Sequence, residues 1–421
     1  MNNFSATFFF SLLYFLWATG CQTSRTFTFA VNSTESSQPI GPVFINLPPE
    51  IQAEEHFLLT DAKTQEILPF QKLGETQGVF ILPSPLSQGE SRNFTLSPTD
   101  KPPFSNFVKA TVSEEEIAIT LKGQPILNYQ VNVQEPPAGN PSYYKRNGFI
   151  HPLFSPGGQI LTEDFPEDHM HHHGIFFAWV NTLFRGEKID FWNQQNQSGT
   201  VSHVEIIDTL SGPVYAQFTC RLQQETLTGK LPEAALDEVW QVSAYHVGPN
   251  YLLDFSSSFS ASSEDTLFIQ AYHYGGFAFR GPDTWFDSTY IPKNDSLKNY
   301  LGVGKGGFLT SEGKTRINGN HSRPNWVDMH GMVDDQEVGV CFFDHPENFR
   351  FPQPVRLHPS MPYFSFSPMV LGAFHIGPDD SYRSQYRIMV HQGVPDTSDL
   401  NLHWEAYANR PEIHWENRKE P

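Results

Sequence analysis

The sequence predicts an all-β protein: a large antiparallel β-sandwich, preceded by a small β-domain and followed by a short helix near the C-terminus. Three observations favour this fold class. Apolar runs have the length of strands and are bounded by Pro, Gly, Asn and Asp. The 33 prolines and 30 glycines follow no period, which favours many turns over long helices. Strand and helix patterns do not alternate along the chain, so a parallel α/β sheet is not indicated.

The first 20 residues differ from the rest and predict an export signal. They carry no charged residue, are apolar in the middle, and end before Cys21 in a small residue. This is typical of a bacterial lipoprotein signal and implies a lipidated Cys21. Because the segment has no Lys or Arg and carries Ala18 where such signals usually have Leu, an ordinary secretory signal is the alternative. We expect export to the bacterial periplasm or cell surface, with a lipid anchor to the membrane through Cys21.

Four segments are expected after this leader. Residues 21–40 are rich in Ser and Thr and predict a tether. Residues 41–105 contain runs such as PVFINL and NFTLSP between turns, and predict the small β-domain. Residues 106–396 continue the strand pattern, for example in VYAQFTCRL and EVWQVSAYHV, and predict the large sandwich with the site. Residues 397–421 predict a helix and tail, because TSDLNLHWEAYAN has helical apolar spacing.

Charge and hydropathy limit the partners. The net charge of −19 argues against nucleic acid, because binding phosphates needs a basic surface. After the leader, no segment approaches the roughly 20 apolar residues of a membrane-spanning helix. The excess of acidic residues is consistent with a role in keeping the protein soluble.

The stretch 149–193 concentrates groups that could carry chemistry. It holds five of the 17 histidines, with acids among them. On a strand, His169, His171 and His173 would lie on one face and His172 on the other. Imidazoles beside carboxylates can act as acid and base, and the carboxylates can orient the rings. The expected catalytic residues are therefore His169, His171, His172, Asp168 and Asp164.

The same stretch leaves a metal site open as an alternative. A His-x-His pair on a strand offers two ligands, and a nearby Asp can be the third. The spacing by itself is not diagnostic, so no cofactor is assigned. If a divalent metal binds, the expected ligands are His169, His171 and Asp168.

Other polar and aromatic residues are expected to hold a substrate. Asp190 and Trp192 place a carboxylate beside an aromatic plate, as sugar sites commonly do. Arg350 lies in a proline-fixed loop, where a guanidinium suits a carboxylate or a pair of hydroxyls, a structural salt bridge being the alternative. The full expected set is His151, Asp190, Trp192, Tyr274, His330, His345, Asn348 and Arg350.

Several motifs resemble a bacterial family of uncharacterised proteins that is often labelled a methane oxygenase of PmoA type. They are HPLFSPGGQILTEDFPEDHMHHHGIFFAW, DFW, YGGFAFR, WVDMHG and FDHPENFRFP. The resemblance covers about residues 40 to 395. The family pattern falls on His151, Pro152, Pro156, Gly158, Asp168, His169, His171, His172 and Gly174. This chain departs from it at Met170, where the family usually has Pro, and at His173, where it usually has Arg. A protonated His173 could replace that guanidinium only in part.

The oxygenase label does not fit the sequence physically. A methane monooxygenase subunit is embedded in the membrane, and this chain has no spanning segment after its leader, so we do not expect that activity. Members of the family resemble secreted sugar-handling proteins. The resemblance implies a galactose-mutarotase-like supersandwich, which is an analogy of fold and does not assign a function.

Three functions are consistent with these patterns. The first is an exported carbohydrate-active enzyme that uses imidazole and carboxylate groups for hydrolysis, elimination or epimerisation of a glycan or sugar derivative. The second is a surface glycan-binding lipoprotein without chemistry, which leaves the histidines unexplained. The third is a metal-dependent, cupin-like enzyme.

Overall fold

The computed structural model describes residues 25–287 and 306–416. The predicted export signal over residues 1–20 and the predicted lipidation of Cys21 lie outside these residues. Within the described part, no helix is both long and apolar enough to cross a membrane.

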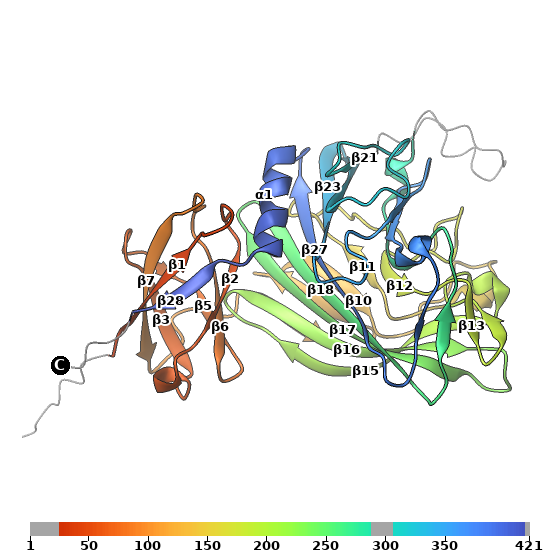
Figure 1. Cartoon of the computed structure of the whole chain (residues 1–421), viewed down its shortest axis with the longest axis horizontal. Helices are drawn as coiled ribbons and strands as arrows, with labels where there is room; N and C mark the ends of the chain where they lie inside the picture. Colours follow the sequence, from red (N-terminus) through yellow and green to blue (C-terminus); the bar gives the residue numbers. More distant parts are fainter. Residues whose placement is uncertain (1–24, 288–305, 417–421) are drawn as a thin grey trace, which may run out of the picture.

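Two eight-stranded antiparallel sheets form the large domain (Figure 1). The first sheet has the order β24 (Val355–Leu357), β25 (Tyr363–Phe366), β20 (Gly276–Arg280), β12 (Ile175–Ala178), β11 (Ile150–Leu153), β10 (Gln124–Gln130), β9 (Glu116–Leu121), β8 (Val108–Val112). The second has the order β15 (Gly199–Leu210), β16 (Tyr215–Thr226), β17 (Glu233–Val247), β18 (Asn250–Ala261), β27 (Tyr382–Gln392), β23 (Gln336–Asp344), β22 (Trp326–Val333), β21 (Gly307–Thr310). This confirms the predicted antiparallel sandwich.

The main core lies between the two sheets because each strand turns alternate side chains inward. Strand β16 shows this alternation almost without a break. Phe277 of the first sheet packs on Tyr386 of the second, with ring centroids 4.6 Å apart, and Phe366 stacks on Tyr386 at 4.7 Å. Buried aromatic pairs of this kind stabilise the sandwich beyond the area that they bury.

Smaller elements surround the two sheets. A four-stranded sheet has the order β14 (Glu187–Ile189), β13 (Thr182–Phe184), β19 (Leu267–Ile269), β26 (Phe374–Ile376). The described 3-10 helices are η1 (Pro49–Ile51), η2 (Ser142–Tyr144), η3 (Gln194–Asn196), η4 (Asp283–Trp285) and η6 (Pro368–Leu371).

The small domain has its own core between a five-stranded and a three-stranded sheet. Their orders are β28 (Glu412–Trp415), β1 (Phe27–Asn32), β7 (Ser91–Thr99), β3 (His56–Asp61), β4 (Ile67–Leu68), and β2 (Pro42–Asn46), β6 (Gln77–Ile81), β5 (Phe70–Leu73). Two of these strands correct the expected boundaries. β1 lies in the segment expected to be a tether, because its alternation buries Phe29 and Val31. β28 comes from the expected tail and pairs with β1.

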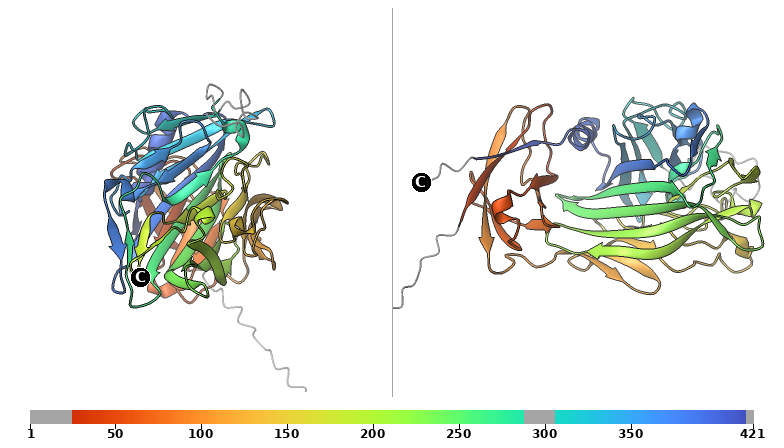
Figure 2. Two further views of the ribbon diagram at one scale, coloured as in Figure 1. Left: turned by 90° about the vertical axis from the view of Figure 1, so that its right-hand side faces the viewer. Right: turned by 60° about the horizontal axis from the view of Figure 1, so that its bottom comes forward.

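The helix α1 (Thr397–Ala408) lies where the sequence predicts it. Asp396 caps its N-terminus by accepting a hydrogen bond from the backbone N–H of Ser398 at 2.9 Å. Its buried residues Leu400 and Tyr407 join a third hydrophobic cluster that also contains Val79 of the small domain. Figure 2 shows α1 between the two domains, so the helix helps to join them.

Candidate functional site

One row of side chains crosses the first sheet on the face turned away from the main core. Phe176 on β12 is the register partner of Ala278 on β20, Ala278 is that of Ser365 on β25, and Ser365 is that of Arg356 on β24. Phe277, the chain neighbour of Ala278, packs on Phe255 and Tyr386 of the second sheet, whereas Phe176 packs on His172 and Trp192. The row therefore forms a floor over which loops can gather.

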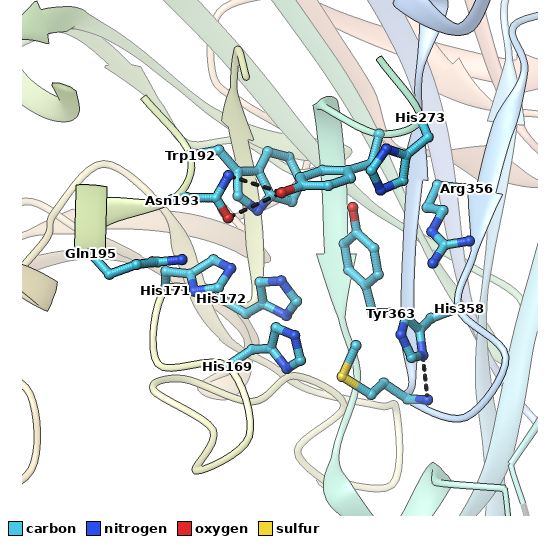
Figure 3. A pocket seen from close by; sticks show the side chains of 12 residues that line it. His169, His171, His172, Trp192, Asn193, Gln195, His273, Arg356, His358 and Tyr363 are labelled. Carbon is cyan, nitrogen blue, oxygen red and sulfur yellow. Dashed lines mark hydrogen bonds between the residues drawn. The ribbon is translucent and has the colours of Figure 1, made fainter. Parts of the chain in front are cut away.

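A cavity of ≈ 260 Å³ lies above this floor. Three groups of residues surround it: the loop before β12, the loop after β14 together with the turn before β20, and the segment of β24 and β25 (Figure 3). It is lined by His169, His171, His172, Trp192, Asn193, Gln195, His273, Tyr274, Arg356, His358, Met361 and Tyr363. Five imidazoles and one guanidinium face this space, and none of its lining residues is a carboxylate.

His169 is oriented by a buried carboxylate behind it. Its Nδ1 lies 3.0 Å from Oδ2 of Asp168, which also forms two hydrogen bonds with Arg280, at 2.8 and 3.0 Å. Burial would raise the pKa of Asp168, but the Arg280 guanidinium and the bond with His169 hold it well below its usual range. The ionised carboxylate can only accept, so Nδ1 of His169 carries the proton. Nε2 of a neutral His169 is then free to act as a base, and 35% of this side chain is exposed.

His172 lies inside a stack of rings beneath His169. Its ring is 5.0 Å from that of His169 and 4.7 Å from that of Tyr363, nearly parallel to both. Burial holds the pKa of His172 well below its usual value, and burial also lowers the pKa of His171 to about 3. Both imidazoles are therefore neutral at physiological pH. Nδ1 of His172 is buried without a hydrogen-bond partner among the described residues.

Backbone N–H groups of the loop that contains His358 fix the tautomer of its imidazole. Its Nδ1 accepts from the backbone N–H groups of Ser360 and Met361 at 3.2 and 3.1 Å. Burial lowers the pKa of His358 to about 3, so the ring is neutral and its single proton is on Nε2. His358 is thus a fixed hydrogen-bond donor at the cavity, across from His169.

Arg356 supplies the positive charge of the cavity. Its Nη1 donates to Oδ1 of Asn320 at 3.2 Å. Within the part of the chain that the structure describes, no carboxylate lies within ion-pair distance of this guanidinium. An unpaired arginine beside neutral imidazoles favours an anionic ligand group.

The remaining wall is polar and aromatic. Asn193 Nδ2 donates to the Tyr274 hydroxyl at 2.9 Å, and the Trp192 ring lies 5.3 Å from the Tyr274 ring. Burial raises the pKa of Tyr274, so the phenol stays protonated. Gly275 and Gly276 carry φ values of 126° and 93°, which lets the chain turn directly after Tyr274.

The sequence from residue 116 to 405 matches the family of unknown function DUF6807. The chain belongs to this family. No curated protein matches the sequence.

Several solved structures of sugar-active proteins are distantly similar to this DUF6807 member. An α-mannosidase from Enterococcus faecalis V583 matches with 10% identity over 94% of this chain and 46% of its own, with a TM-score of 0.44. A galactose mutarotase related enzyme from Lactobacillus acidophilus matches with 9% identity over 68% of this chain and 97% of its own, with a TM-score of 0.29. The chain spans about half the length of the mannosidase. At these TM-scores the similarities carry no argument about activity.

The predicted strand over the histidine motif is wrong. Residues 169–172 form turns between β11 and β12, so the expected alternation does not apply. His169, His171 and His172 face the cavity together, whereas His173 is fully buried and its Nδ1 bonds Asp164 at 2.6 Å. Burial lowers the pKa of His173 despite the opposing Asp164 carboxylate. His173, at which the sequence resemblance led us to expect an Arg, is therefore outside the cavity.

Several residues expected to hold substrate are engaged elsewhere. The loop DHPENFR, residues 344–350, does not line the cavity: Asn348 bonds Asp344, and Arg350 donates to the backbone oxygens of Pro368 and Gly372 at 2.8 and 2.6 Å. His345 packs on Tyr407 with ring centroids 4.9 Å apart. These residues therefore fix the positions of loops. The sequence pattern of a polar, proline-containing loop after a strand is the same for such a structural role as for a binding site.

His330, His151 and Asp190 also have structural partners. His330 bonds Asp328 at 2.6 Å, and His151 bonds the Thr162 hydroxyl at 2.9 Å. Asp190 accepts from the backbone N–H groups of Trp192 and Asn193 at 3.0 and 2.8 Å. Asp190 therefore positions the wall, whereas Trp192 and Tyr274 of the expected set line the cavity itself.

The geometry does not favour the expected metal ligands. Across residues 25–287 and 306–416, no group of three or more His, Cys, Asp or Glu is arranged to hold a metal ion. Asp168 is occupied by Arg280 on both carboxylate oxygens, which removes it as a ligand beside His169 and His171.

The sequence interpretation did not include seven of the residues that line the cavity: Asn193, Gln195, His273, Arg356, His358, Met361 and Tyr363. One local signal was available. Arg356 and His358 are two residues apart at the end of a strand, which places both on one face. The pairing that brings this face opposite His169 has no local signature.

Proposed function

We propose that this protein is a carbohydrate-active enzyme that removes a proton next to the carboxylate of a uronic-acid sugar. The observation that carries this proposal is a cavity with an unpaired Arg356, five imidazoles and no lining carboxylate. The reaction belongs to elimination or epimerisation, because both begin with this proton transfer.

The residue types of the cavity argue against hydrolysis by the usual pair of carboxylates. That mechanism needs two Asp or Glu side chains flanking the glycosidic bond. Asp168 is committed to Arg280, and Asp164 is bonded to His173 away from the cavity. Imidazole is left as the base at neutral pH.

In the proposed step, Nε2 of His169 takes the proton from the carbon next to the carboxylate. The electron pair of the C–H bond moves into the carboxylate, which becomes an enediolate with one more negative charge. Arg356 and the Nε2–H of His358 are placed to bind these oxygens, and hydrogen bonds to the developing charge strengthen in the transition state. The enediolate then either expels the oxygen substituent on the neighbouring carbon, which leaves with the proton that His169 has taken, or takes a proton from water on the opposite face while His169 returns its proton to the solvent.

The aromatic groups support a sugar as the ligand. Tyr274 and Tyr363 line the same space as the polar groups and can contact the apolar face of a sugar ring. A neutral His358 that donates from a fixed tautomer resembles the way in which other enzymes use an uncharged imidazole to polarise an oxygen.

The exchange of substrate hydrogen with deuterated water tests this function. Polygalacturonate, alginate and glucuronan would each be incubated with the mature chain, and neutral xylan would be the control polymer. We expect deuterium next to the carboxylate, or an unsaturated product, from at least one uronate polymer and not from xylan. His169→Ala should abolish the exchange, and His375→Ala, which changes an exposed histidine on β26, should not. Binding of a uronate polymer with neither exchange nor an unsaturated product would make the protein a glycan-binding module and would overturn the proposal.

We also propose that the protein is exported from the cytoplasm and is attached to the membrane by a lipid anchor on Cys21. This rests on the N-terminal sequence. The expected result is a membrane-bound mature protein that Cys21→Ala releases from membranes. Recovery of the unaltered chain in the cytoplasm would contradict it.

A further inference from the structure

A second and larger cavity lies between the small domain and the outer face of the second sheet. Its volume is ≈ 510 Å³, within the range of ligand sites. Phe44, Leu73 and Gln77 of the small domain line one side, and strands β16, β17, β18 and β27 line the other. We call this cavity the interdomain groove. None of its lining residues belongs to the histidine cavity.

The outer face of the second sheet changes character along its strands. Tyr245, Leu252 and Met389 are register partners, and all three are buried in the cluster that joins the two domains. Four residues further along the strands, the row consists of Gln241, Ser256 and Gln385. The groove opens where the apolar cover ends and this polar row begins.

Two adjacent polar rows provide hydrogen-bonding groups at regular spacing. Gln217, Ser243 and Asp254 form the row next to Gln241 and Ser256. Adjacent strands lie roughly 4.8 Å apart, about the span of one sugar ring. A flat face with amide and hydroxyl groups at this interval can meet the hydroxyls of successive sugar units.

Several of these groups are free to take a ligand. The side chains of Gln241, Ser256 and Arg383 have no hydrogen-bond partner among residues 25–287 and 306–416, whereas the hydroxyl of Ser243 is bonded to Gln217 at 3.0 Å. Asp254 is paired with Arg387 through two hydrogen bonds of 2.7 and 2.9 Å. Of the three open groups, Gln241 and Ser256 are uncharged and Arg383 carries a positive charge.

The charge of the groove separates it from the histidine cavity. Its lining contains the acids Asp208 and Asp254 and the bases Arg383 and Arg410, whereas the histidine cavity has no lining carboxylate; Asp254 is also paired with Arg387 behind it. Phe44 forms part of the wall, with the Arg410 guanidinium 5.2 Å from its ring centre. An aromatic residue beside amides and hydroxyls, in a lining that carries charges of both signs, suits a polyhydroxyl ligand.

We propose that the interdomain groove is a second carbohydrate-binding site, which takes an uncharged stretch of a glycan chain. It is separate from any chemistry in the histidine cavity. Its place at the domain junction means that both domains contact the same ligand.

Titration calorimetry with cellohexaose, xylohexaose, mannohexaose and laminarihexaose tests the groove. The titrated protein would be the mature chain with His169→Ala, so that no turnover intervenes. We expect at least one of these neutral hexasaccharides to bind. Gln241→Ala should weaken that binding about fivefold to tenfold through the loss of one or two hydrogen bonds. Ser256→Tyr, which fills the groove, should abolish it.

Gln65→Ala is the matched control, because it removes an exposed amide from a turn of the small domain outside the groove. It should leave the affinity unchanged, and an unchanged melting temperature would establish that each variant is folded. If no hexasaccharide binds, or if binding survives both groove variants, the groove is not a carbohydrate site. Because the probes carry no carboxylate, these results do not depend on whether the histidine cavity acts on uronates.

Discussion

The histidines of the cavity and the histidines around Asp328 are the same residue type in opposite environments. Asp328 is buried between two of them, 2.6 Å from Nδ1 of His330 and 2.8 Å from Nε2 of His391. In the cavity, His169 has a carboxylate partner, but His172 is buried with a nitrogen that no described residue bonds. We call the first group the Asp328 cluster.

The pKa of His330 is shifted in the opposite direction from those of His171 and His358. Burial lowers the pKa of His330, but the hydrogen bond with Asp328 and the charges of Asp328 and Glu337 together outweigh it, and the pKa is raised overall. In the cavity, burial dominates and lowers the pKa of His171 and of His358 to about 3. The comparison teaches that the density of histidines does not identify a site. What distinguishes the cavity is that its imidazoles include a buried nitrogen, Nδ1 of His172, to which no described residue is bonded.

The largest expected effect is the loss of activity on removing the imidazole of His169. If it is the base, His169→Ala should lower kcat/KM for a uronate polymer by about 10²- to 10⁴-fold. His330→Gln is the control from the Asp328 cluster and should leave kcat/KM within about twofold of the parent. Initial rates of proton exchange measure both variants. Equal losses in the two would remove the distinction between cavity and cluster.

The next effect concerns stability and falls on the Asp328 cluster. Asp328→Asn leaves two buried histidines facing an amide, and should lower the free energy of unfolding by about 3 kcal/mol. Urea unfolding measures this, and the rate per folded molecule should not change. Asp168→Asn makes the same chemical change behind His169, so it should lower the rate per folded molecule as well. A normal rate in that variant would remove Asp168 as the residue that orients His169.

A fall in pH should change the stability contributed by the cavity histidines and by His330 in opposite directions. Between the ordinary histidine pKa of 6.5 and about 3, the unfolded chain binds protons that folded His171 and His358 do not. Stability therefore falls as the pH falls through this window, by up to about 1.4 kcal/mol per pH unit for each histidine. The contribution of His330 is instead complete below 6.5 and is lost as the pH rises through its raised pKa.

Unfolding free energies at a series of pH values separate these contributions. His358→Asn should reduce the loss of stability between pH 6 and pH 5 by about 1 kcal/mol. His330→Asn should leave the acid side unchanged and flatten the decline above neutral pH. If His358→Asn has the same acid dependence as the parent, His358 is not held neutral.

The fold was more predictable than the site, for reasons that particular elements illustrate. Period-two alternation is a local property, and in β16 it continues over the whole strand. β28 has only four residues at the end of the chain, and its place is set by pairing with β1 at the other end. A strand so short carries too few apolar positions to be recognised before its partner is known.

The near wall of the cavity was visible in the sequence because His169, His171 and His172 are close neighbours. Their arrangement was not, because a turn replaced the expected strand. The far wall forms because β24 is joined to β12 through β25 and β20. This pairing places Arg356 in the same row across the sheet as Phe176. Such a register is decided by the whole sheet and not by the residues beside Arg356.

The smallest expected effect belongs to His345, which the sequence suggested as part of the site. Its ring packs on Tyr407 and only 13% of its side chain is exposed, so His345→Ala should cost about 1 kcal/mol of stability through lost packing. Because the ring does not line the cavity, kcat/KM should stay within about twofold of the parent. His358→Ala is the contrasting variant, since it removes an imidazole of similar burial that does face the cavity, and it should lower kcat without a comparable rise in KM. Should His345→Ala instead reduce kcat as His358→Ala does, the wall of the site would have to extend to the DHPENFR loop, and the histidine cavity would be only part of it.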